Sequence, residues 1–255
     1  MRTLFFLLAA LLISPVLKSQ THPGGGDINL DDNRMNFDYS WEEWQDRKNK
    51  HWQGLDIGIN SLIYEDGTDV PPAGFKGMQL DYGRSFYFGV NIYEQGIPIV
   101  GEYFKGVVGI GLDYYNFQLK GNDLMVSEGD SMTLRTDTVF GYRNNNMKNS
   151  WVTVPLLLGV NTSQYNSSSF HIAAGVILGY RLTGKQKIKF WDGEICNTIR
   201  RKSNMHQNPW RATATVRIGY GNFHLFGNYS LTDYWAEGEA PKARVMVVGI
   251  KVIPW

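Results

Sequence analysis

Few residues of this 255-residue chain have the types and spacing of a catalytic centre. A hydrolase needs a nucleophile, a histidine and a carboxylate gathered in one place, and His171, His206 and His224 are the candidate bases. His206 lies in a loop, and the other two lie near the start of predicted strands, at the wrong end for a site at an outer rim. The chain has no HExxH, GxSxG or phosphate-binding glycine loop. We therefore predict no enzyme, and a lipid-modifying enzyme is the least favoured alternative.

The overall composition excludes several other classes of site. A single cysteine, Cys196, rules out an intrachain disulfide bond and a multi-cysteine zinc site. The 25 Lys and Arg residues against 24 Asp and Glu give a net charge of +1, whereas a dedicated nucleic-acid-binding protein is usually strongly basic. We predict no cofactor, no metal and no nucleic-acid partner.

Apolar and polar residues alternate through most of the chain after residue 51. From Trp210 to Tyr220 the even positions are apolar and the odd positions are polar or small, which is typical of a strand with two unlike faces. Similar rows predict eight strands, over residues 52–63, 85–95, 104–119, 150–162, 169–183, 209–220, 223–234 and 243–253.

The lengths of the connections between these strands indicate the kind of sheet. They are about 21, 8, 30, 6, 25, 2 and 8 residues, so longer and shorter links alternate, as in outer-membrane barrels with long outer loops and short periplasmic turns. We therefore predict an all-β chain that forms an eight-stranded antiparallel transmembrane β-barrel in the outer membrane. The alternative is a soluble, secreted, ligand-binding β-barrel of inverted polarity, with its apolar rows facing inward.

If the apolar rows face lipid, the opposite faces line a narrow lumen. Two carboxylates and four cations would then have to pair, because an unpaired buried charge costs several kcal/mol. We predict that they form a polar network that plugs the lumen, with a narrow pore as the alternative. The charged residues of this network are Asp56, Asp113, Arg181, Arg211, Arg217 and Lys251.

Aromatic residues cluster at the ends of the predicted strands. Indole rings favour the headgroup layer of a membrane, where one edge of the ring is apolar and the other is wet. We predict interfacial positions for Trp52, Trp151, Trp210, Trp235 and Trp255.

The connection over residues 184–208 is basic. Outside the cell it would meet lipopolysaccharide phosphates or an acidic partner. The alternative that we favour is pairing with the acidic first and third connections, over residues 64–84 and 120–149. Its cations include Lys185, Lys187, Lys189, Arg200, Arg201 and Lys202.

The N-terminal residues predict export of the chain. Arg2 precedes an apolar stretch over residues 4–13, which is too short to span a bilayer permanently and is typical of a signal peptide over residues 1–19. Ser40-Trp41-Glu42-Glu43 has the form of a capping box that opens a short helix. We expect residues 20–50 to form a flexible segment and this short helix in the periplasm, followed by a barrel over residues 51–255.

Several short motifs, in order along the chain, resemble the PorT-like outer-membrane β-barrel proteins of Gram-negative bacteria. The resemblance implies an eight-stranded barrel in the outer membrane. As partners of such a barrel we expect outer-membrane lipid and lipopolysaccharide, with other envelope proteins as a further possibility. It implies a structural, docking or porin-like role rather than a defined chemistry. The motifs are HWQGLDIGIN (51–60), LDYGRS (80–85), VPLLL (154–158), AGV (174–176), NPWR (208–211) and YSL (229–231).

Overall fold

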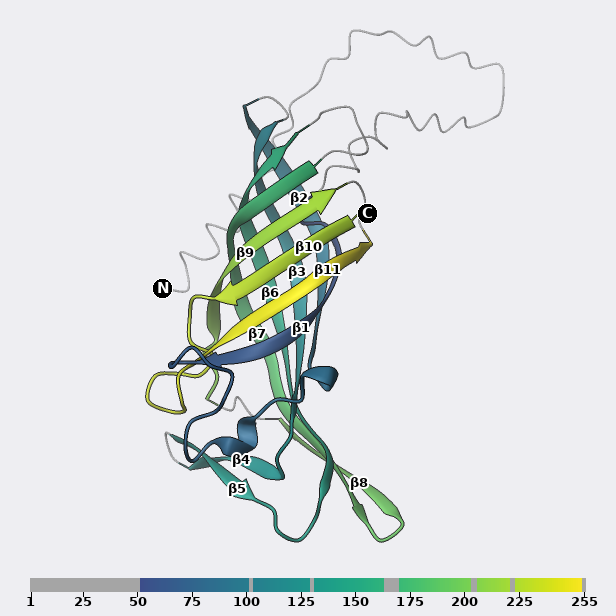
Figure 1. Cartoon of the computed structure of the whole chain (residues 1–255), viewed down its shortest axis with the longest axis vertical. Helices are drawn as coiled ribbons and strands as arrows, with labels where there is room; N and C mark the ends of the chain where they lie inside the picture. Colours follow the sequence, from purple (N-terminus) through teal and green to yellow (C-terminus); the bar gives the residue numbers. More distant parts are fainter. Residues whose placement is uncertain are drawn as a thin grey trace, which may run out of the picture. The chain divides into compact units, whose positions relative to one another are not determined.

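Eight antiparallel strands pair edge to edge in a closed ring (Figure 1). The computed structural model describes residues 51–100, 103–128, 131–162, 170–202, 206–220 and 223–253. The strands of the ring are β1 (Gly54–Tyr64), β2 (Phe86–Val100), β3 (Phe104–Leu119), β6 (Tyr142–Asn161), β7 (Phe170–Asp192), β9 (Trp210–Tyr220), β10 (Phe223–Ser230) and β11 (Ala243–Ile253). They pair in the order β6-β3-β2-β1-β11-β10-β9-β7, and β6 also pairs with β7, which completes the ring.

These pairings confirm the all-β, eight-stranded antiparallel fold that the alternation predicted. The signal peptide, the helix expected before residue 51 and the C-terminal Trp255 lie outside the described residues. In the part of the chain that the structure describes, no helix combines the length and the apolar composition needed to cross a membrane.

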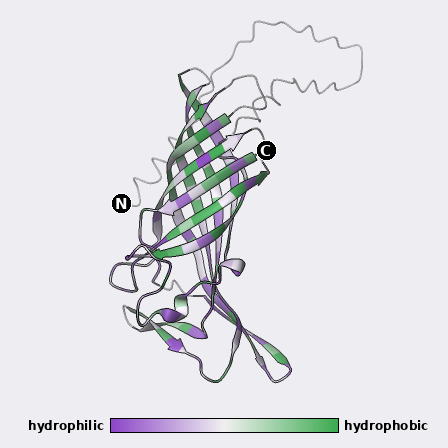
Figure 2. Cartoon of the chain, viewed as in Figure 1, coloured by the Kyte–Doolittle hydropathy of each residue, from purple (hydrophilic) through white to green (hydrophobic). Residues whose placement is uncertain are grey.

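The apolar rows of the strands point to the outside of the ring. Leu158 on β6, Val216 on β9 and Val248 on β11 are 53, 47 and 55% exposed, whereas Thr215 and Val247 beside them are buried. Figure 2 shows hydrophobic and hydrophilic residues alternating along the strands of the barrel. Since side chains in a strand alternate strictly between its two faces, this polarity overturns the soluble alternative with apolar rows inside.

Long and short connections lie at opposite ends of the ring. Residues 65–85, 120–141, 193–209 and 231–242 join strands at one end, here called the loop end. Residues 101–103, 162–169 and 221–222 join them at the other, the turn end, where β1 also begins and β11 ends. The loop end is the lower one in Figure 1, where β4, β5 and β8 are labelled.

Two strands are longer at the loop end than the sequence predicted. β6 begins at Tyr142 rather than at 150, and β7 continues to Asp192 rather than to 183. Beyond the ring, β7 also pairs with β8 (Ile195–Lys202). Residues 142–149 are rich in Asn and have no apolar row, so the ladder with β7, rather than hydrophobic patterning, makes them a strand.

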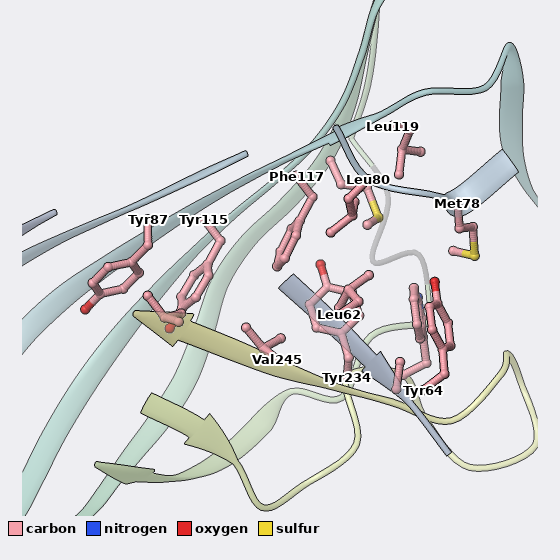
Figure 3. Packing of buried hydrophobic residues seen from close by; sticks show 14 of the residues in the cluster. Leu62, Tyr64, Met78, Leu80, Tyr87, Tyr115, Phe117, Leu119, Tyr234 and Val245 are labelled. Atoms are coloured by element: carbon pink, nitrogen blue, oxygen red, sulfur yellow. The ribbon is translucent and has the colours of Figure 1, made fainter. Parts of the chain in front are cut away.

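The long loops fold over the loop end as a cap. They contribute a β4–β5 hairpin (Asp123–Glu128 and Ser131–Thr136) and two 3₁₀ turns, η2 (Lys76–Met78) and η3 (Tyr82–Arg84). Figure 3 shows the apolar cluster that joins this cap to the barrel, in which the row Tyr87, Tyr115 and Phe117 leads toward Leu80 and Leu119. The Met132 amide also donates a hydrogen bond to the Glu239 carbonyl, which ties the hairpin to the last loop.

A lysine on the outer face should be costly if lipid surrounds the ring. Val216 lies on this face about midway between Trp210 and Tyr220, and we expect Val216→Lys to reduce the free energy of unfolding by about 2–4 kcal/mol. The measurement is urea unfolding of the protein in phospholipid bilayers. Val139→Lys, in a loop where the side chain is 77% exposed, is the matched control and should change little. Equal effects of the two substitutions would contradict a lipid environment around β9.

Candidate functional site in the barrel interior

Because side chains alternate between the two faces of each strand, most of the charged residues predicted for the polar network point into the lumen. Asp56 on β1, Asp113 on β3, Arg211 and Arg217 on β9 and Lys251 on β11 are all buried, none more than 7% exposed. Arg181, on β7 toward the loop end, is only partly buried. The structure therefore brings five of the six charged residues together inside the ring and leaves Arg181 at its rim.

The first ion pair crosses the lumen from β9 to β3. Arg211 Nη2 lies 2.8 Å from Asp113 Oδ2, and the Tyr87 hydroxyl donates to Asp113 Oδ1 at 2.9 Å. The Arg211 guanidinium lies between two rings, 4.7 Å from the centroid of Tyr115 and 4.5 Å from that of Trp151. Charge pairing and contacts with two aromatic rings hold this buried cation in place.

The second ion pair joins β9 to β1 in the same manner. Arg217 Nη2 lies 2.6 Å from Asp56 Oδ2, and Asn91 Nδ2 donates to the same oxygen at 2.9 Å. The guanidinium lies 4.5 Å from the Trp52 ring and 5.1 Å from the Phe226 ring. Each carboxylate thus has an arginine and a neutral hydrogen-bond donor, so the desolvation of four buried charges is offset by direct contacts.

Residues 51–53, just before β1, fill the lumen at the turn end. His51 and Trp52 are at most 1% exposed, and the Lys251 ammonium donates to the His51 carbonyl at 3.0 Å. The Glu94 carboxylate accepts the backbone N–H groups of His51, Trp52 and Gln53 at 3.1, 2.7 and 2.9 Å. We call residues 51–53 the plug segment; three hydrogen bonds to a single anion fix its backbone across the opening.

Strict alternation does not predict the role of Glu94. Phe86, Phe88, Val90 and Ile92 form an apolar row, and even numbering would turn Glu94 outward with them. A register shift between Asn91 and Tyr93 in the β2–β3 ladder adds one residue to β2 and turns Glu94 inward. No pattern in the sequence marked this bulge, so the sequence analysis missed the residue.

A histidine cluster lies beside the plug segment. His171 Nε2 and His224 Nδ1 are 2.9 Å apart, and the centroids of the His51 and His171 rings are 5.7 Å apart. Two glycines make room for these rings: an added Cβ would lie 1.9 Å from His171 Nε2 at Gly219 and 2.7 Å from His51 Nε2 at Gly159. Among the described residues, no group of three His, Cys, Asp or Glu side chains is arranged to hold a metal ion.

A third network closes the loop end of the lumen. The Tyr234 hydroxyl accepts hydrogen bonds from Asn149 Nδ2 and, at 2.9 Å, from Gln207 Nε2. Arg181 Nη1 donates to the Gln207 carbonyl at 2.6 Å. Arg181 therefore fastens the 193–209 connection to β7, at some distance from the two ion pairs.

Three of the five tryptophans predicted at the membrane interface are buried, and for these the prediction is wrong. Trp52, Trp151 and Trp235 are at most 2% exposed. Trp52 belongs to the plug segment, and the Trp151 side chain points into the lumen from β6. Trp235 packs in the cap, where its backbone forms an isolated β-bridge with Gln207. Trp210 is 49% exposed on the outer face and Trp255 lies outside the described residues. Position at a strand end does not distinguish an inward ring from an outward one.

The predicted basic connection is mostly strand rather than loop. Lys185, Lys187 and Lys189 lie on β7, and Arg200, Arg201 and Lys202 lie on β8. Among the described residues, none of the six has a carboxylate within ion-pair distance, so the favoured pairing with acidic loops is not found there.

A family model described as "outer membrane protein beta-barrel domain" matches residues 45–234, which is well over half of the chain. Neither the curated proteins nor the solved structures contain a match. The matched range contains seven of the eight ring strands and both cross-lumen ion pairs.

Removing one partner of a cross-lumen ion pair should be more damaging than removing both. We expect Arg211→Met to reduce the free energy of unfolding by about 3–5 kcal/mol, because Asp113 would remain charged and buried. The double variant Arg211→Met/Asp113→Asn should lose distinctly less. The measurement is urea unfolding in bilayers, with Arg244→Met at an exposed pair with Asp233 as the control that changes little. Equal losses in the single and double variants would show that the charge pairing is unimportant.

The Glu94 carboxylate should control the mobility of the plug segment. In Glu94→Gln the three N–H groups lose an anionic acceptor, so we expect their amide hydrogens to exchange roughly 10- to 100-fold faster. Hydrogen exchange of residues 51–53 is the measurement, and Gln95→Ala, on the exposed side of the same strand, is the control. Unchanged protection in Glu94→Gln would mean that other contacts hold the plug segment.

Proposed function

Because this chain belongs to the family of outer membrane protein β-barrel domains, we propose that this integral outer-membrane protein is a closed, non-conducting barrel with a structural or docking role. The observation that carries the proposal is the filling of the lumen by buried side chains at both ends and between them. The PorT-like assignment remains a finer prediction within this family, and contacts with other envelope proteins are a separate expectation.

Three layers of buried groups support the closed state. The plug segment occupies the turn end, the two ion pairs cross the centre, and Tyr234 with its amide partners occupies the loop end. An eight-stranded barrel is only wide enough for side chains to fill it. A narrow pore, the alternative, would require an ion to displace arginines that are paired with carboxylates and held between aromatic rings.

The folded cap supports a role at the loop end. In outer-membrane barrels the short turns face the periplasm and the longer loops face outward, which assigns the cap to the cell exterior. The cap contains the β4–β5 hairpin and two 3₁₀ turns and shares an apolar core with the barrel, so it presents a defined surface rather than loose loops. We propose no catalytic activity: His171 and His224 lie by the plug segment, at the opposite end from the cap.

Conductance in planar lipid bilayers tests the proposal. We expect the full-length mature protein, with insertion verified by heat-modifiable migration on SDS gels, to give no regular conductance steps in KCl. The double variant Trp52→Gly/Glu94→Ala, which removes the ring of the plug segment and its anchor, should also give none, because the two ion pairs and the Tyr234 network still cross the lumen. Steps from this variant would show that the plug segment alone closes the barrel. Trp210→Gly, which removes an outward-facing ring, is the matched control and should stay silent. Regular steps from the unaltered protein would overturn the proposal and favour the narrow pore.

A further inference from the structure

Six cations share the outer face of the sheet that extends beyond the ring. In the β6–β7 and β7–β8 ladders, Lys148 pairs with Lys185, Lys185 with Lys202, and Lys187 with Arg200. Directly paired residues of antiparallel strands lie on the same face, and Lys189, two residues beyond Lys187, joins them. We call this set the basic face: Lys148, Lys185, Lys187, Lys189, Arg200 and Lys202.

Burial shows which side of the sheet the basic face occupies. Gln186 and Ile188 alternate with the lysines of β7 and are at most 2% exposed, because they face the cap. Lys185, Arg200 and Lys202 are exposed, and the other three cations are half-buried. The basic face therefore lies on the outside. A register shift between Ser150 and Trp151 in the β6–β7 ladder puts these odd-numbered lysines on the same side as the outward-pointing, even-numbered Tyr180.

The basic face follows directly after the outward apolar rows. Tyr180 and Trp210, whose ring centroids are 4.7 Å apart, are 45 and 49% exposed at the loop-end limit of those rows, where aromatic girdles of such barrels lie. Lys185 is five residues farther along β7, or ~16 Å along the strand. The cations of β7 thus lie on the loop-end side of the level expected for the lipid headgroups.

Neighbouring carboxylates do not neutralise these cations within the described residues. Asp137 accepts the Tyr142 hydroxyl at 2.8 Å and the amides of Val139 and Phe140, and Asp123 accepts the Thr136 hydroxyl. Burial and then the charges of neighbouring cations, with Lys189 first, lower the pKa of Lys187. The cations repel one another, and a multivalent anion would relieve that repulsion.

We propose that the basic face binds the phosphate groups of lipopolysaccharide in the outer leaflet. Charge complementarity and the position on the loop-end side of the apolar belt, next to its outward-facing aromatic rings, favour a lipid-linked anion over an acidic protein. Lysine ammonium groups and the Arg200 guanidinium are suitable donors to phosphate oxygens. The Lys148 ammonium lies 6.0 Å from the centroid of the outward-facing Tyr114 ring, which links the basic face to the belt below it.

Retention of lipopolysaccharide by the purified, detergent-solubilised full-length protein tests this proposal. The probes are lipopolysaccharide and the same lipopolysaccharide after enzymatic dephosphorylation. We expect the unaltered protein to prefer the phosphorylated form and to lose that preference as NaCl is raised. Lys185→Gln/Lys187→Gln/Lys189→Gln should weaken retention at least roughly tenfold, since each cation near an anionic lipid surface contributes to binding.

A second triple variant separates specific binding from the effect of net charge. Lys76→Gln/Arg84→Gln/Lys242→Gln removes three exposed cations elsewhere at the loop end and should retain lipopolysaccharide normally. Heat-modifiable migration identical to that of the unaltered protein shows that each variant is folded. Equal losses in both triple variants, or equal retention of both probes by the unaltered protein, would overturn the proposal; the second result would leave an acidic protein as the occupant. Neither result depends on whether the barrel conducts ions.

Discussion

Charge neutralisation inside a narrow barrel is the constraint on which the rest of the lumen depends. Arg211 and Arg217 project from one strand into a space with little water, where each must have a counterion to be tolerated. Asp113 and Asp56 supply it from across the ring, and two aromatic rings lie close to each guanidinium group. The tyrosine, asparagine and tryptophan around the pairs follow from this requirement, and together they leave the centre of the barrel occupied.

Most of the ring and its charged residues could be predicted from the sequence, because one physical rule governs both. Alternation with a period of two specifies which residues face inward, and it placed Asp56, Asp113, Arg211 and Arg217 in the lumen without knowledge of their partners. The rule fails where the backbone departs from it. The bulge in β2 reverses the direction of Glu94, and Trp52 lies before β1, where no alternation applies.

The loop end shows a different limit of sequence patterns. Residues 142–149 and 184–192 have no continuous apolar row, so they resemble loops although they continue the ladders of β6 and β7. Their strand structure comes from pairing with each other and from packing of Met147 and Ile188 under the cap. Sequence patterning detects a contrast between lipid and lumen, and beyond the membrane that contrast disappears while the hydrogen-bonded ladder persists.

The placement of both arginines on β9 has a consequence for how the barrel assembles. On one side of β9, strands β10 and β11 separate it from β1. On its other side, β7 and β6 separate it from β3. A partly assembled sheet without β1 would hold Arg217 with no carboxylate and would also lack the plug segment that covers its guanidinium. Such an intermediate is penalised electrostatically, so the last strand pairing and the neutralisation of the interior occur together. The ring is therefore expected to fold and unfold as one cooperative unit, rather than by loss of single strands from an edge.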